Sequence, residues 1–67
     1  MTSKNQGGDG TLPVSERQTI FAALVAAQDS GLSVEASRAK VAEQFGLGVG
    51  YVRDIEREGL KNEWPPL

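Results

Sequence analysis

Residues 38–57 read RAKVAEQFGLGVGYVRDIER, and this stretch decides the expected fold. Apolar residues at helical spacing lie on both sides of Gly46, which tolerates the left-handed backbone conformation common at a helix end. Two helices joined by so short a turn must cross steeply, and Ala42 is small enough to let their backbones touch. The apolar anchors of this corner are Val41, Phe45, Leu47, Val52 and Ile55. The stretch therefore predicts two helices, 34–45 and 49–61, that meet at a sharp turn.

A further helix is expected over residues 16–29. Ser15 and Gln18 have the spacing of a capping box, in which the hydroxyl and the amide satisfy free backbone N–H groups at a helix start. Gly31 suits the position after the helix end, and Ser33 is the natural N-cap of the helix that follows. The inward face of the 16–29 helix is predicted to consist of Ile20, Phe21, Leu24, Val25 and Gln28.

The two ends of the chain differ in character. Residues 1–13 are rich in glycine and turn formers, which predicts a disordered tail in front of a folded domain at 14–67. Trp64 precedes two prolines and is expected to fold back as a lid on a core that is otherwise thin in aromatic residues. Gly59 either ends the last helix or permits close packing there. The expected fold class is all-α, a three-helix helix-turn-helix domain behind a disordered N-terminal tail.

Composition excludes several functional classes. The chain has 67 residues, no cysteine and no histidine, so disulfides, thiolate metal sites and histidine-based catalysis are excluded. We expect no enzyme activity, no cofactor and no metal, because a few short helices rarely enclose a pocket. No apolar run is long enough to cross a bilayer and no leader opens the chain, which predicts a cytoplasmic protein without membrane contact. The net charge of −2 counts against nucleic-acid binding unless the basic residues cluster.

The corner at 38–57 resembles the helix-turn-helix family of DNA-binding domains. That family has apolar residues at the fourth, eighth, tenth, fifteenth and eighteenth positions of its motif, alanine at the fifth and glycine at the ninth. Counted from Arg38, this sequence matches at every one of these places. The resemblance implies that the second helix of the pair, 49–61, enters the major groove as the recognition helix.

A closer resemblance covers residues 41–60, VAEQFGLGVGYVRDIEREGL, which look like region four of bacterial primary sigma factors. The shared residues are Phe45, Gly46, Val52, Arg53, Ile55, Glu56 and Leu60. In that family the region reads the upstream promoter element and contacts the RNA polymerase core, so the resemblance implies a role in bacterial transcription regulation. Sigma factors carry an Arg-Glu-Arg run where this chain has Val49, Gly50 and Tyr51, and the basic run after the helix is replaced by residues 62–66. Promoter specificity of the sigma type therefore does not carry over.

Charge placement supplies the candidate binding residues. Arg53, Arg57 and Lys61 follow one another at i, i+4 and i+8, which predicts a basic stripe opposite the buried side of the helix. Arg53 and Arg57 are expected to reach base edges or phosphates, with flanking backbone contacts from Lys61 and Arg38. Asp54 lies beside the stripe and would repel phosphate. The full set of candidate nucleic-acid-binding residues is Arg38, Val49, Gly50, Tyr51, Arg53, Asp54, Arg57 and Lys61.

Alternatives stay open for several of these residues. Tyr51 either donates to a phosphate or stacks on a sugar, or else it covers the turn. Glu56 is expected to form a hydrogen bond to the turn or to Arg38. The stripe itself could be an ordinary solvated face, neutralised by Asp54, Glu56 and Glu58.

Three hypotheses for the function follow. The first is a module that binds double-stranded DNA, weakly as a monomer, so that useful affinity requires a homodimer or a larger complex. The alternative is a protein-interaction module that docks on RNA polymerase or a transcription factor without reading DNA. A third is a purely structural role.

Overall fold

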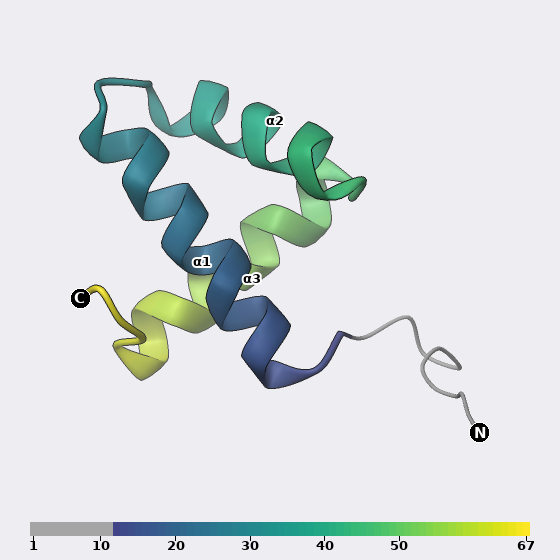
Figure 1. Ribbon diagram of the computed structural model, residues 1–67, viewed down its shortest axis with the longest axis vertical. Coiled ribbons are helices and arrows are strands. Elements are labelled where there is room, and N and C mark those ends of the chain that lie inside the picture. Colours follow the sequence, from purple (N-terminus) through teal and green to yellow (C-terminus); the bar gives the residue numbers. More distant parts are fainter. Residues whose placement is uncertain (1–11) are drawn as a thin grey trace.

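The computed structural model describes residues 12–67, which form three helices (Figure 1). They are α1 (Val14–Asp29), α2 (Val34–Phe45) and α3 (Val49–Asn62). Each helix contacts the other two: α1 crosses α3 near the middle of the molecule, and α2 lies across one side of both (Figure 1). No strand occurs in the described part of the chain, and the predicted all-α fold is confirmed.

The start of α1 differs from the expectation. The helix begins at Val14 rather than at residue 16, because the carbonyl of Pro13 already accepts the backbone N–H groups of Glu16 (3.1 Å) and Arg17 (3.0 Å). Ser15 therefore lies inside the first turn, and no side chain caps the helix. The capping box predicted from Ser15 and Gln18 is wrong.

The expected tail falls mostly outside the described residues. Of the segment 1–13, only Leu12 and Pro13 are described. Leu12 packs partly buried against the core, and its backbone N–H donates to the Tyr51 hydroxyl at 2.9 Å. The chain is thus anchored to α3 just before α1 begins.

The corner between α2 and α3 forms as predicted. Ser33 caps α2 by accepting the backbone N–H of Ala36 at 3.1 Å. Gly46 ends the helix in the left-handed conformation, with φ 70° and ψ 37°, which costs glycine little because it has no Cβ. Residues 46–48 then turn the chain, and α3 starts at Val49. The two helices are separate, and the corner leaves the outer side of α3 uncovered by α2.

The core lies where the three helices meet, and an aromatic pair closes it. Trp64 folds back as predicted and meets Phe21 edge to face, with ring centroids 6.1 Å apart and planes at 80°. Gly59 lies against the same phenylalanine: a Cβ there would come within 2.2 Å of Cδ1 of Phe21. Close packing is therefore the role of Gly59. The buried apolar residues are Ile20, Phe21, Leu24, Ala27, Val41, Ala42, Val52, Ile55 and Trp64.

One expectation about the core is wrong, and one buried residue was not expected. Phe45, predicted to be a buried anchor, is 36% exposed because it is the last residue of α2 and its ring only leans toward α1. Ser37 is polar and is nevertheless fully buried, which the pattern of apolar residues did not predict. Its hydroxyl donates to the carbonyl of Val34 (2.7 Å) and accepts from Nε2 of Gln28 (3.1 Å), so burial leaves no polar atom unpaired.

Candidate nucleic-acid interface

The outer side of α3 carries the predicted basic stripe: Arg53, Arg57 and Lys61 are all exposed. The nearest carboxylate on the same helix is Asp54, whose Oδ1 lies 3.8 Å from Nη1 of Arg57. Both side chains of this pair are largely exposed (61% and 74%), so the contact contributes little stability and little neutralisation. Within residues 12–67, no ion pair involves Arg53 or Lys61.

Glu56, the first of the remaining acidic residues of α3, lines a groove with Arg53 and Arg57, but its carboxylate is bound by residues of the other two helices. Its Oε1 accepts from Nε of Arg38 at 2.8 Å, with Nη2 of the same guanidinium also at 2.8 Å. Its other oxygen accepts from Nε2 of Gln28 at 3.1 Å. Glu56 therefore joins all three helices and is not a partner of the stripe. The predicted contact with Arg38 is confirmed.

Glu58 is the second such carboxylate, and it binds α1. It receives two parallel hydrogen bonds from Arg17, at 2.9 Å and 3.0 Å. The hydrogen bond to Glu58 raises the pKa of Arg17, while burial acts in the opposite direction. The same guanidinium also donates to the carbonyl of Leu12. Glu58 thus holds the start of α1 against α3.

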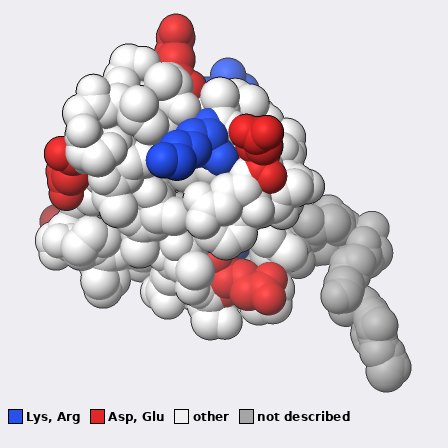
Figure 2. All heavy atoms as spheres, turned by 45° about the horizontal axis from the view of Figure 1, so that its top comes forward, with Lys and Arg blue, Asp and Glu red and all other residues white. Residues whose placement is uncertain are grey.

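These pairings leave a local excess of basic charge on the outside of α3, although the whole chain carries −2. The basic area is small. The stripe consists of three side chains on two turns of α3. Figure 2 looks onto another face, with α2 turned forward, where basic side chains lie beside acidic ones and most of the surface is uncharged. A basic stripe of this size can contact a few phosphates, but it is too short to follow the DNA backbone over many of them.

The first turn of α3 offers few polar groups. Val49 is exposed, and a Cβ on Gly50 would meet no atom within 4 Å, so backbone is accessible there. Tyr51 is half-buried against the core, with its hydroxyl accepting from Leu12. Tyr51 thus braces the start of α3 against the segment before α1, which corresponds to the covering role left open for it.

The structure brings together only part of the predicted set. Arg38, Arg53 and Arg57 line one groove between α2 and α3, with a volume of about 350 Å³. Lys61 does not line this groove, and neither do Val49, Gly50, Tyr51 and Asp54. The other groove residues are Val34, Glu56 and Leu60. The prediction missed Val34 and Leu60 as parts of this surface, since a pattern of charges alone says nothing about the apolar walls beside them.

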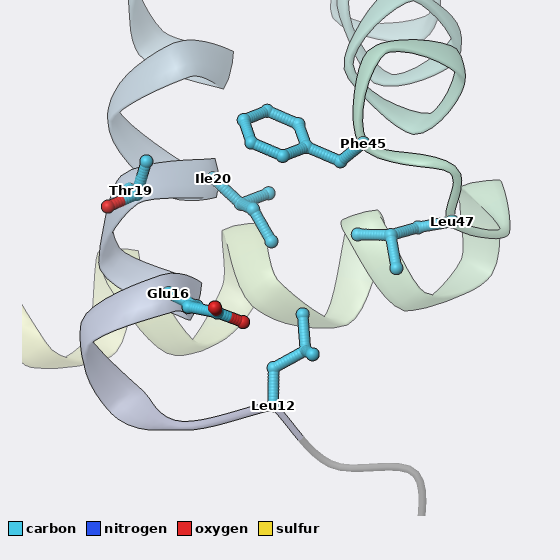
Figure 3. A pocket seen from close by; sticks show the side chains of 6 residues that line it. All are labelled: Leu12, Glu16, Thr19, Ile20, Phe45 and Leu47. Carbon is cyan, nitrogen blue, oxygen red and sulfur yellow. The ribbon is translucent and has the colours of Figure 1, made fainter.

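A second hollow, of about 420 Å³, lies between the start of α1 and the turn after α2 (Figure 3). Its lining residues are Leu12, Glu16, Thr19, Ile20, Phe45 and Leu47. The ring of Phe45 points across it toward α1, and Glu16 is the one ionisable residue in the lining (Figure 3). A hollow with a single carboxylate has no pair of groups for acid–base chemistry, and it is separate from the basic stripe.

Two further findings concern membrane-spanning helices and metal sites, and the similarity of the chain to known proteins. Over residues 12–67, neither a helix that could cross a membrane nor a cluster of metal-ligating side chains is present. Comparison with protein families, curated proteins and solved structures finds no match to this chain.

Proposed function

We propose that this domain docks on double-stranded DNA, with α3 lying in the major groove and α2 crossing above it. The observation that carries the proposal is the pairing of the two carboxylates Glu56 and Glu58. Because both bind arginines of other helices, the basic stripe on α3 stays exposed, and within residues 12–67 Asp54 is the one carboxylate that forms an ion pair with it. The sharp corner at Gly46 supports the same arrangement, since it separates α3 from α2.

In this proposal the contacts divide by position along α3. Arg53 and Arg57 reach base edges or phosphates, and Lys61 contacts the flanking backbone. Gly50 lies on the first turn of this helix, and the space beyond its Cα is open. Arg38 is oriented by Glu56 and contacts the backbone on the α2 side.

Binding by a single copy is expected to be weak. Contact with about three or four phosphates gives a shallow dependence of the binding constant on salt. Useful affinity then requires a homodimer on two half-sites or a larger assembly. The sigma-like sequence of 41–60 makes bacterial transcription the proposed setting.

The test is a fluorescence anisotropy titration of a labelled, mixed-sequence duplex at low salt. The double substitution Arg53→Ala/Arg57→Ala is expected to weaken binding about tenfold or more, since it removes two phosphate or base contacts. Lys40→Ala, which removes an exposed charge from α2 outside the groove, is the matched control and should change little. Identical curves for wild type and the double variant would rule out the assigned face.

A second candidate is docking on RNA polymerase or a transcription factor without reading DNA. It is favoured by the first turn of α3, where Val49 and Gly50 present no hydrogen-bonding side chain to a base. Retention of purified RNA polymerase core on the immobilised domain, after nuclease treatment, supports this candidate. Failure to retain it counts against it.

A further inference from the structure

We propose that the groove between α2 and α3 is also a docking site for an acidic amphipathic helix of a partner protein. This goes beyond DNA binding, because it assigns to the same arginines a second ligand of a different class. The inference does not depend on DNA binding and can hold without it.

Two of the residues that line the groove are apolar and exposed. Val34 at the start of α2 is 46% exposed, and Leu60 on α3 is 56% exposed. Arg53, Glu56, Arg57 and Leu60 lie at i, i+3, i+4 and i+7 on α3, so the groove runs for two helical turns, or about 10 Å. That length matches two turns of a helix laid against it.

The charges in the groove favour an acidic occupant. Glu56 is occupied by Arg38, which leaves Arg53 and Arg57 as the groove charges that can bind carboxylates. Asp54 is only 3.8 Å from Arg57, but that exposed pair is easily exchanged for a better-placed carboxylate. The groove therefore offers two guanidinium groups beside an apolar surface.

DNA would use only half of this surface. Phosphates can pair with Arg53 and Arg57, but the polar DNA backbone gains nothing from covering Val34 and Leu60. A helix with apolar residues spaced at i and i+4 and acidic residues beside them would bury the apolar walls and pair with both arginines. The two ligands would compete, because each needs the same guanidinium groups.

The experiment uses a fluorescein-labelled helical peptide with leucine at every third or fourth position and glutamate elsewhere. One control peptide has glutamine in place of every glutamate, and another has serine in place of every leucine. The full-length domain is titrated against each, and the folding of every variant is checked by the fluorescence of Trp64. We expect the acidic peptide to bind about tenfold more tightly than either control, and unlabelled duplex to displace it.

Substitutions in the groove distinguish binding of the peptide from binding of the duplex. Val34→Gln/Leu60→Gln is expected to weaken peptide binding about tenfold and leave duplex binding unchanged, while Arg53→Ala/Arg57→Ala weakens peptide binding as well. If the double glutamine variant unfolds, Leu60→Gln alone serves, since that side chain is mostly exposed.

Three results would overturn the proposal. The acidic peptide does not bind, the serine peptide binds with the same affinity, or Leu60→Gln leaves the affinity for the acidic peptide unchanged. Peptide binding without any duplex binding would overturn only the DNA proposal.

Discussion

Glu56 of α3 binds Arg38 of α2, with 2.8 Å between Oε1 and Nε, and forms no ion pair with Arg53 or Arg57 on the outer side of its own helix. One contact thereby does two things. It ties α2 to α3 on the far side of the Gly46 corner, and it removes a carboxylate that would otherwise neutralise the basic stripe. Stability and the proposed binding surface thus depend on the same pair.

Glu56→Gln tests the stabilising part of this relationship. The substitution weakens the charge-assisted bond to Arg38 in a partly buried setting, so the free energy of unfolding should fall by about 1–2 kcal/mol. Urea denaturation followed by Trp64 fluorescence measures it. Glu43→Gln, at an exposed position of α2, is the matched control and should stay within about 0.5 kcal/mol of wild type. Equal stability of the two variants would show that the Glu56 contact is dispensable.

Two glycines of α3 should respond to alanine with opposite signs. Gly59→Ala should destabilise the domain by about 1–3 kcal/mol, because the new methyl group overlaps the ring of Phe21. Gly50→Ala should stabilise it by up to about 1 kcal/mol, because alanine favours helix and the space there is open. Thermal melts recorded by circular dichroism measure both. A stabilised Gly59→Ala variant would mean that α3 does not pack this closely on α1.

Trp64→Ala should leave little folded protein at room temperature. Removing a buried indole typically costs about 3–5 kcal/mol, and a domain of this size has only a few kcal/mol to lose. The helical signal in circular dichroism should fall accordingly. Leu67→Ala, which truncates an exposed side chain nearby, should melt like wild type. A cooperative melt of Trp64→Ala at the wild-type temperature would contradict the role of this residue as a lid.

Gly50→Arg should strengthen duplex binding. The position lies in open space at the start of α3, so an arginine there can add one phosphate contact without disturbing the core. The slope of log K against log salt should steepen by about 0.9. Gly50→Gln adds a side chain of similar reach without charge and should leave the slope unchanged. If Gly50→Arg leaves the slope of log K against log salt unchanged, this turn does not face the DNA.

The fold follows closely from local sequence signals. Gly46 and Ser33 specify the end and the start of α2 through backbone conformation and capping, which depend on a few neighbouring residues. The pattern misled at Ser15, because the carbonyl of Pro13 starts the helix earlier. It also misled at Phe45, because helical spacing does not reveal that the last residue of α2 lies over a hollow rather than in the core.

The candidate site could be predicted only in part. The exposure of Arg53, Arg57 and Lys61 followed from the helical period alone. The partners of Glu58 and Arg17 did not, because their contact joins residues 41 positions apart and depends on how α1 packs against α3. Val34 and Leu60 come to line one groove through the packing of α2 against α3, which the sequence pattern did not predict either.

The most direct test of the central claim is an NMR titration of the ¹⁵N-labelled domain with a mixed-sequence duplex at low salt. The account predicts that amide shifts move along the outer side of α3, around Arg53, Arg57 and Lys61, while those on the exposed side of α1 stay in place. Shifts confined to α1, or no shifts in α3 at saturating duplex, would contradict it.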